Sequence, residues 1–329
     1  MLRLSTESAT LRLAQPFRIS GYVFETAEVL VVTLDDGTHQ GRGEGAGAYY
    51  LGDDLARMLA DVEAACAAVE ARPTREQLRA LMPAGGARNA VDAALWELEA
   101  RRSGTPVWRL AGLSEPPRPI VTTFTVSADT PEAMAAVARG YARARSIKVK
   151  LTGELDLDLA RVAAIRAARP DVWLGVDGNQ GFARGELDAL VAGLLPHDVS
   201  LLEQPLARGA EAELDGYRSA IPIAGDESLL TLDDIASAVG RFDVVNIKLD
   251  KCGGLTEGLL MAAEARRLGL GVMVGTMIGT SLATAPGFVL GQLADLVDLD
   301  GPTFLAEDRA PGVRYDDGLL YADAEVWGG

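Results

Sequence analysis

The sequence predicts an α/β protein, a (β/α)₈-type barrel with an N-terminal α+β capping domain that the C-terminal tail completes. Three observations favour this fold. Short apolar segments alternate with helical segments from residue 120 onward, and there are about eight of them. Their ends lie roughly 20–30 residues apart, the length of one βα unit. A proline-rich stretch, residues 115–119, separates them from a first part in which strands precede helices.

The composition is that of a globular protein and excludes several classes of partner. The chain has 329 residues, 48% of them apolar and 24% charged, so it can bury a large core. Its 31 Lys+Arg against 47 Asp+Glu give a net charge of −16, and no basic cluster occurs. Nucleic acids and anionic membranes are therefore not expected as partners. Because the start lacks the apolar core of a signal peptide, we expect a cytoplasmic protein.

The first part, residues 1–115, is expected to form the capping domain. Val29–Leu34 is apolar and β-branched, and the turn residues Asp35–Gly37 follow it, which indicates a β-hairpin. Asn89–Arg102 has apolar residues at helical spacing, so a helix is predicted there. The glycine-rich run Gly41–Gly47 lacks the Lys-Ser/Thr of a phosphate-binding loop, and we expect a flexible turn near the lid of the barrel.

Residues 116–304 are expected to form the barrel, and residues 305–329 to pack back on the capping domain. The predicted barrel strands are Ile120–Val126, Ile147–Leu151, Val172–Val176, Ser200–Leu202, Ile221–Ala224, Val244–Leu249, Val272–Val274 and Leu296–Leu299. Helices such as Leu159–Ala168 lie between them. In such a barrel, charged residues that follow the strands face one mouth, where the βα loops build a site.

Three carboxylates stand at the ends of three successive predicted strands: Asp177, Glu203 and Asp226. So close together, they would repel one another and take up protons unless a cation neutralised them. Oxygen ligands without His or Cys favour Mg²⁺, and both histidines of the chain lie in turn-like sequence. The alternative, that each carboxylate caps the following helix, stays open for any one of them but is disfavoured for three in succession.

Lysines flank these carboxylates on both sides. Lys150 ends the second predicted strand and Lys248 the sixth, and alternation along the strand points Lys148 the same way as Lys150. A lysine close to other cations has a lowered pKa and can act as a base at neutral pH. Two bases on opposite sides of one carbon can remove a proton on one side and return it on the other, which is racemisation or epimerisation. A metal that chelates the substrate carboxylate would stabilise the enediolate formed in between.

In this order, these residues resemble the muconate-lactonizing subgroup of the enolase superfamily, a group of modified TIM barrels, and within it the dipeptide epimerases of the L-Ala-D/L-Glu type. The likeness spans nearly the whole chain. Besides the strand ends, it rests on Pro83–Trp96, on Asn246–Glu257 and on Asp298–Thr303. It implies an isomerase of murein peptide metabolism that inverts the α-carbon of the C-terminal residue of a dipeptide.

The resemblance also implies roles for individual residues. The three carboxylates would bind Mg²⁺, one ion per subunit. Lys150 and Lys248 would be the two acid/base residues, and Lys148 would support Lys150. Asp298 and Asp300 would hold the α-ammonium group of the dipeptide, since paired carboxylates recognise an ammonium; a surface turn is the alternative for this pair.

The capping loop, residues 16–24, should close over the site by the same resemblance. Several Ala-Glu epimerases have an arginine further along this loop, suited to a glutamate side chain, where this chain has Tyr22 and Phe24. Either Arg18 replaces that arginine or the second residue of the substrate is not Glu, because aromatic residues suit a hydrophobic side chain. Met277 and Ser281, from the end of the seventh strand, are also expected to contact the substrate.

Other activities stay open at this point. An N-acylamino-acid racemase, or a lyase such as an o-succinylbenzoate synthase or a cycloisomerase, uses the same metal and lysines but does not need Asp298 and Asp300. A non-catalytic metal-binding scaffold is a third hypothesis, which the complete set of carboxylates and lysines disfavours. The expected partners are a small dipeptide and, as an open alternative, further copies of the chain in a homo-oligomer.

Overall fold

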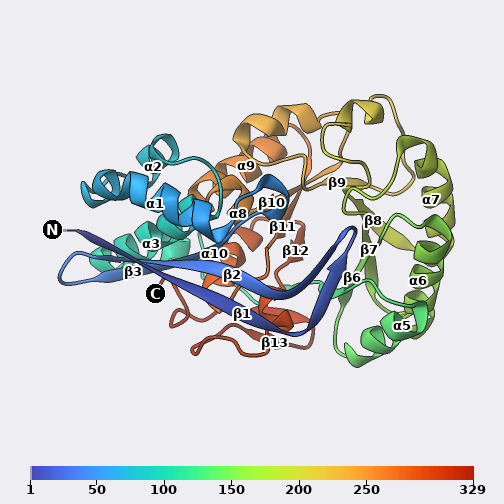
Figure 1. Ribbon diagram of the computed structural model, residues 1–329, viewed down its shortest axis with the longest axis horizontal. Helices are drawn as coiled ribbons and strands as arrows, with labels where there is room; N and C mark the ends of the chain where they lie inside the picture. The colour runs from blue at the N-terminus through green and yellow to red at the C-terminus, as the bar shows by residue number, and fades with distance from the viewer. Residues whose placement is uncertain (1) are drawn as a thin grey trace.

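The computed structural model describes residues 2–329 and contains the predicted barrel (Figure 1). Parallel strands β5 to β12 follow one another in an 8-stranded sheet in the order of the chain. The two outer strands of this sheet meet through isolated hydrogen bonds: Thr123 N donates to Val297 O (2.9 Å), and Leu299 N donates to Thr122 Oγ1 (2.9 Å). The predicted fold class is therefore confirmed as a nearly closed barrel.

The barrel alternates strands with helices along most of its length. Its strands are β5 (Phe124–Val126), β6 (Ser146–Lys150), β7 (Trp173–Asp177), β8 (Val199–Glu203), β9 (Ile223–Gly225), β10 (Val244–Lys248), β11 (Gly271–Gly275) and β12 (Leu296–Asp298). Its α-helices are α5 (Pro131–Gly140), α6 (Leu155–Ala168), α7 (Leu187–Leu194), α8 (Leu249–Cys252), α9 (Leu255–Arg267) and α10 (Ser281–Gly291). Its 3₁₀-helices are η2 (Arg184–Glu186), η3 (Leu195–His197), η4 (Glu211–Leu214), η5 (Leu232–Ala238) and η6 (Gly301–Phe304). Each predicted strand coincides with an observed one to within a few residues.

A 3-stranded antiparallel sheet and a set of helices form the N-terminal part. Its elements are β1 (Arg3–Ile19), β2 (Tyr22–Asp35), β3 (Gln40–Ala46), η1 (Tyr49–Leu51), α1 (Leu55–Glu70), α2 (Arg75–Leu81), α3 (Gly86–Ser103) and α4 (Val107–Leu110). β1 and β2 form a long hairpin that crosses the molecule toward β6 in Figure 1. Its tip is bonded to the loop after β5, because Ser127 Oγ accepts from Arg18 N and Ala128 N donates to Arg18 O (3.0 Å). The hairpin thus covers the barrel mouth.

The prediction for the glycine-rich run was wrong, because this run is the buried strand β3 and not a flexible turn. Its alternate glycines let α3 lie directly on the strand. A Cβ atom at Gly43 would lie 2.1 Å from Ala90 O, and one at Gly41 would lie 2.1 Å from Ala94 O. No side chain fits between these two backbones. Glycines at every second position mark the face of a strand that is pressed against a helix.

Buried polar contacts join the N-terminal part to the barrel. Asp92 in α3 accepts a hydrogen bond from Thr256 N (3.0 Å) in the first turn of α9. Asp250 in α8 accepts from Asn89 Nδ2 (2.8 Å) and from Ala46 N (2.9 Å). Because α8 and α9 come directly after β10, these contacts fix the N-terminal part relative to the end of that strand.

The C-terminal segment contacts both parts of the molecule. Its strands β13 (Arg314–Asp316) and β14 (Leu319–Tyr321) form an antiparallel sheet with β4 (Ile120–Val121), which comes just before the barrel. Beyond them, Trp327 Nε1 donates to Arg42 O (3.0 Å) in β3. The domain boundaries given above stay a prediction. Across residues 2–329, the helices are all too short or too polar to cross a membrane.

Candidate active site

The three carboxylates predicted from the sequence meet at the mouth of the barrel. Asp177 is the last residue of β7 and Glu203 the last residue of β8, and the two lie side by side in the parallel ladder. Asp226 directly follows β9. All three residues are buried, with at most 1% of their surface exposed. Each carboxylate therefore depends on the protein, rather than on bulk water, for its partners.

Lys150 and Lys248 approach these carboxylates from opposite sides. They end β6 and β10, which flank β7, β8 and β9 in the barrel. Lys150 Nζ lies 2.6 Å from Asp177 Oδ2, and Lys248 Nζ lies 2.5 Å from Asp226 Oδ2. Both ammonium groups thus face the same space between the strand ends. Burial opposes the charge on Lys248, but Asp226 outweighs burial and raises its pKa, so the lowered pKa expected for a lysine base is not present at Lys248.

Lys148 lies among the carboxylates rather than beside them. Its Nζ is 3.0 Å from Asp177 Oδ2. It is also 2.8 Å from Glu203 Oε2 and 2.8 Å from Asp298 Oδ2. Burial opposes the charge on this ammonium, but the three carboxylates outweigh burial and raise the pKa of Lys148 well above its usual value. Lys148 is therefore a fixed positive charge at the centre of the mouth.

Buried charge in the mouth shifts the pKa of each carboxyl group. Burial alone would raise the pKa of Asp177, but the two lysines of β6 outweigh it and lower this pKa to about 2. Lys248 and Lys251 likewise outweigh burial and hold the pKa of Asp226 below its usual range. Burial and the charge on Asp177 raise the pKa of Glu203 to about 8. Glu203 is thus the carboxyl group for which the lysines supply too little positive charge.

The three carboxylates have the chemistry of a Mg²⁺ site. They are buried oxygen ligands, and Glu203 Oε2 has an ion-pair contact with Lys148 at 2.8 Å but no well-directed hydrogen bond. Within residues 2–329, as arranged here, no three acidic, His or Cys side chains converge on a metal position. The lysine ammonium groups lie against the oxygens instead. A divalent cation would supply the positive charge that Glu203 lacks, so the residues fit Mg²⁺ if the ion takes over oxygens that now contact lysines.

Two residues that the sequence did not single out hold the carboxylates in place. Asn246 Nδ2 donates to Glu203 Oε1 (2.8 Å). Lys251, which is 1% exposed, places its Nζ 2.6 Å from Asp226 Oδ1. Asn246 could have been found, because it is two residues before Lys248 on β10 and so points the same way. Lys251 lies in the short helix α8, and no spacing rule connects it with Asp226.

Asp298 and Asp300 lie together at the end of β12. Thr123 Oγ1 donates to Asp298, and Thr125 N donates to Asp300 Oδ2 (2.6 Å). Burial and the charge on Asp298 raise the pKa of Asp300 to about 7. Both residues are buried, so the alternative of a surface turn is wrong.

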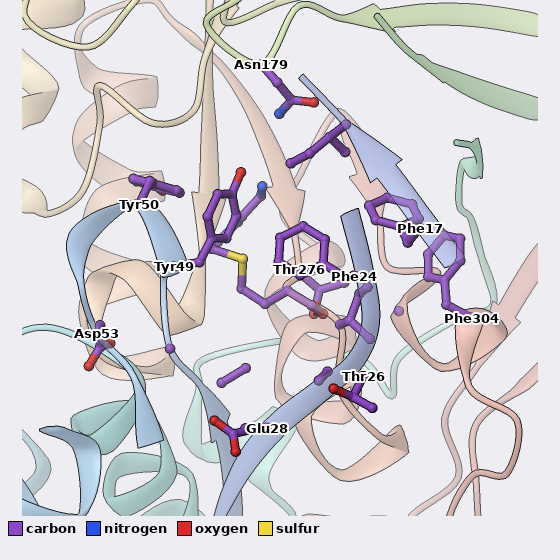
Figure 2. Close-up of a pocket in the computed structure, with 18 of the residues that line it drawn as sticks. Phe17, Phe24, Thr26, Glu28, Tyr49, Tyr50, Asp53, Asn179, Thr276 and Phe304 are labelled. Atoms are coloured by element: carbon purple, nitrogen blue, oxygen red, sulfur yellow. The ribbon is translucent and has the colours of Figure 1, made fainter. Parts of the chain in front are cut away.

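A cavity of about 500 Å³ lies between the barrel mouth and the hairpin of β1 and β2 (Figure 2). Its polar end is lined by Lys148, Lys150, Asn179, Glu227, Lys248, Asp298 and Asp300. Its apolar and aromatic lining comes from Phe17, Ile19, Phe24, Tyr49, Tyr50, Met277, Ile278 and Phe304, among others. Tyr49, Tyr50 and Phe304 were not identified from the sequence. They belong to the short helices η1 and η6, whose positions over the mouth depend on the tertiary fold.

The residues predicted to contact a substrate divide into two groups. Phe24 and Met277 line the cavity. Arg18 does not: it is directed outward, with its guanidinium 3.4 Å from Asp129 and 45% of its side chain exposed. Tyr22 is 46% exposed and is not among the lining residues, but it shares the face of Phe24 on β2 and stacks on that ring, with centroids 6.0 Å apart. The prediction that Arg18 faces the substrate is therefore wrong, because its side chain extends from the outer side of the hairpin tip. The contact predicted for Tyr22 stays a prediction.

Ser281 requires a further correction. It is fully buried at the start of α10 but does not line the cavity. Its N–H donates to Asp308 Oδ1 (3.0 Å), and its Oγ accepts from Val313 N (2.8 Å). Ser281 thus anchors the C-terminal segment rather than a substrate. Its hydroxyl is directed by these two partners, which are distant in the sequence.

Two family models match the chain. The first is described as mandelate racemase / muconate lactonizing enzyme, N-terminal domain, and matches residues 3–112. The second is described as enolase C-terminal domain-like and matches residues 130–324. The two matches together cover most of the chain, and the second includes every strand-end residue discussed above.

Curated relatives match over almost their full length. The L-Ala-D/L-Glu epimerase of Escherichia coli (strain K12) is 39% identical over 308 residues, which are 93% of this chain and 95% of that protein. The hydrophobic dipeptide epimerase of Roseobacter litoralis is 36% identical over 344 residues, 100% of this chain and 98% of that protein.

Solved structures share the whole architecture. An enolase family member from Agrobacterium tumefaciens with homology to dipeptide epimerases, with bound sodium and L-Ala-L-Glu, has a TM-score of 0.95 and 39% identity, and 100% of each chain is covered. The dipeptide epimerase from Enterococcus faecalis complexed with Mg and L-Leu-L-Tyr has a TM-score of 0.91 and 26% identity, with 97% of this chain and 96% of that chain covered.

Proposed function

Because the chain belongs to the mandelate racemase/muconate lactonizing enzyme family of the enolase superfamily, we propose that it is a Mg²⁺-dependent dipeptide epimerase. It inverts the α-carbon of the C-terminal residue of a dipeptide. The observation that carries the proposal is the pair Lys150 and Lys248, which face one space from opposite sides of a group of buried carboxylates. The names of the relatives, which are epimerases of dipeptides, support it.

Lys150 and Lys248 act as the two acid/base residues. One lysine, in its neutral form, takes the α-proton from one side of the carbon, and the other, as an ammonium, returns a proton on the opposite side. After one turnover the first lysine is protonated and the second is neutral. The pair is then in the protonation state that the reverse reaction requires. Lys148, held by three carboxylates, keeps its proton and contributes positive charge to the site.

Asp177, Glu203 and Asp226 are the residues that would hold the metal. The chemistry that a bound Mg²⁺ supplies in such a site is Lewis-acid stabilisation of the negative charge that develops on the substrate carboxylate. Asn246 and Lys251 orient two of these carboxylates through hydrogen bonds. The three carboxylates form a single group, so we expect one Mg²⁺ ion per subunit.

Asp298 and Asp300 bind the α-ammonium group of the dipeptide. Both carboxylates line the cavity, Asp298 Oδ2 lies 2.8 Å from Lys148 Nζ, and Thr123 and Thr125 hold the pair in position. A free ammonium would favour the ionised form of Asp300, whose pKa is raised by burial and by Asp298. An N-acylated amino acid has no such ammonium, so this pair favours dipeptides over N-acylamino acids and over lyase substrates.

Exchange of the α-hydrogen with solvent tests this function directly. The protein is incubated with Mg²⁺ and a panel of L,L-dipeptides in D₂O, and the loss of the α-proton signal is followed by NMR. We expect exchange at the C-terminal residue of at least one dipeptide and none for the corresponding N-acetylamino acids. Absence of exchange with every dipeptide would contradict the function, and faster exchange of N-acetylamino acids would favour the racemase alternative.

A further inference from the structure

Two groups of the substrate, its inverted carbon and its α-ammonium, are assigned to known parts of the cavity, which leaves another part for the side chain of the second residue. If the proposed function holds, the inverted carbon lies between the two lysine bases and the α-ammonium lies at the two aspartates of β12. Phe304 belongs to η6, which follows these aspartates, and its ring lies 4.8 Å from that of Phe17. These two rings therefore border the ammonium end. Phe24 and Tyr49 belong to the lining that remains, together with other residues such as Tyr50, Met277 and Ile278.

Phe24 and Tyr49 form an uncharged wall. Their ring centroids lie 5.2 Å apart in an edge-on arrangement, and both rings face the cavity in Figure 2. Tyr22, on the same face of β2 as Phe24, packs against this wall with its ring 4.6 Å from that of Tyr49. Burial, together with the charge on Glu227, raises the pKa of Tyr49 well above its usual value, so its hydroxyl stays neutral.

This part of the cavity contains no cationic partner for a side-chain carboxylate. Of the described residues 2–329, the Lys, Arg and His side chains that line the cavity are the three lysines at its polar end. Arg18 is turned outward to Asp129. Glu28 also lines the cavity, but it lies four residues from Phe24 along β2, so its carboxylate is not beside these rings. Because no cation lies at this wall, a glutamate side chain would lose its hydration against the aromatic rings without compensation.

We propose that Phe24 and Tyr49 determine the substrate side chain, so that the enzyme acts on dipeptides whose C-terminal residue is apolar or aromatic, such as L-Ala-L-Leu and L-Ala-L-Phe. This inference rests on the proposed function and specifies its substrate class. Acidic second residues, as in L-Ala-L-Glu, are poor substrates because Phe24 stands where a cation would be needed. Basic second residues are also poor substrates, since their charge would be desolvated against the same rings.

The test compares kcat/KM for L-Ala-L-Phe, L-Ala-L-Leu, L-Ala-L-Glu and L-Ala-L-Lys. For the unaltered protein we expect the two apolar dipeptides to be at least about tenfold better than the two charged ones. Phe24→Arg should lower kcat/KM for L-Ala-L-Phe and raise it for L-Ala-L-Glu. The matched control is Val23→Arg, which puts the same charge on the neighbouring residue. Val23 is 60% exposed and points to the other face of the hairpin, so the order of substrates should not change.

Two further variants keep the test decisive if Phe24→Arg does not fold. Phe24→Leu should retain the preference for apolar side chains. Tyr49→Ala should reduce kcat/KM for L-Ala-L-Phe more than for L-Ala-L-Leu, because the phenyl ring of the substrate loses more contact than the smaller leucine side chain. Equal or higher kcat/KM for L-Ala-L-Glu or L-Ala-L-Lys would overturn the proposal, and so would equal effects of Phe24→Arg and Val23→Arg. If no dipeptide were a substrate, the proposed function itself would fail, which is a different result.

Discussion

The ammonium group of Lys251 lies 2.6 Å from Oδ1 of Asp226, and neither side chain has any exposed surface. Leu229 O and Asn246 O also accept hydrogen bonds from this ammonium, at 3.0 and 3.1 Å. Asp226 thus has one oxygen fixed by Lys251 and the other 2.5 Å from Lys248. Asp226, which is proposed to hold the metal, is therefore positioned by Lys251, a lysine that does not face the cavity.

Replacing Lys251 by methionine should destabilise the protein strongly. The variant removes one of the two ammonium partners of the buried Asp226 carboxylate, and breaking a buried ion pair costs about 3–5 kcal/mol. The free energy of unfolding, measured by urea denaturation, checks this value. The double variant Lys251→Met/Asp226→Asn should recover part of the loss, because the buried carboxylate charge that lost one partner is gone. A cost below about 1 kcal/mol for Lys251→Met would show that this ion pair contributes little.

The pH dependence of stability should contain a contribution from Asp92. Burial raises the pKa of this carboxyl group to about 6, from 3.8 for an exposed aspartate, although Thr256 donates hydrogen bonds to it. Between these two values the folded chain binds a proton that the unfolded chain has lost. Raising the pH through this window therefore lowers the free energy of unfolding, by about 1 kcal/mol between pH 5 and pH 7.

Asp92→Asn removes this titration while keeping one acceptor for Thr256. Urea denaturation of both proteins at several pH values gives the difference in unfolding free energy. We expect the variant to gain stability relative to the unaltered protein as the pH rises. A difference that stays constant from pH 5 to pH 7, or that changes with the opposite sign, would contradict a raised pKa at this site.

Mg²⁺ should stabilise the fold as well as support activity. At a concentration about 100-fold above its dissociation constant, a ligand that binds only the folded state adds about 2.7 kcal/mol. Thermal unfolding should therefore shift to higher temperature with Mg²⁺, and EDTA should reverse the shift and stop α-hydrogen exchange. Glu203→Gln should abolish the shift. The control Asp171→Asn removes a carboxylate whose side chain is 63% exposed and should leave the shift unchanged. An equal shift in both variants would rule out the three carboxylates as the binding site.

Asp300→Asn should weaken the recognition of dipeptides. The variant removes one charged partner of the substrate ammonium, and hydrogen bonds to charged groups contribute about 1.5–3 kcal/mol, which corresponds to a rise in KM of about tenfold to a hundredfold. Steady-state kinetics with a good dipeptide substrate measures this rise. Any residual activity on an N-acetylamino acid, which has no ammonium group, should not fall. An unchanged KM for dipeptides would assign the ammonium to a different site.

Much of the barrel and its polar mouth could be predicted because both follow from local rules. A buried strand must be apolar, and its last residue faces the mouth, so Asp177, Glu203 and Lys248 could be located by counting strands. Alternation along one strand then placed Lys148 beside Lys150. No knowledge of long-range contacts was needed for these residues.

The residues that were missed or misplaced depend on contacts between distant parts of the chain. Tyr49 reaches the cavity because η1 folds over the barrel mouth. Ser281 has a hydroxyl that could face a substrate, but Asp308 and Val313 bind it instead. The run Gly41–Gly47 resembles a mobile turn by composition, and only the packing of α3 against it explains its glycines. Composition and spacing cannot specify such pairings.

The two-sided mechanism is tested most directly with the single variants Lys150→Ala and Lys248→Ala. Each variant retains one base, on one side of the α-carbon. In D₂O with Mg²⁺, each should therefore exchange the α-hydrogen of only one epimer of the same dipeptide, with opposite choices for the two variants and no net epimerisation by either. If both variants lost exchange of both epimers equally, or if either one still interconverted the epimers, the assignment of Lys150 and Lys248 as opposed bases would be wrong.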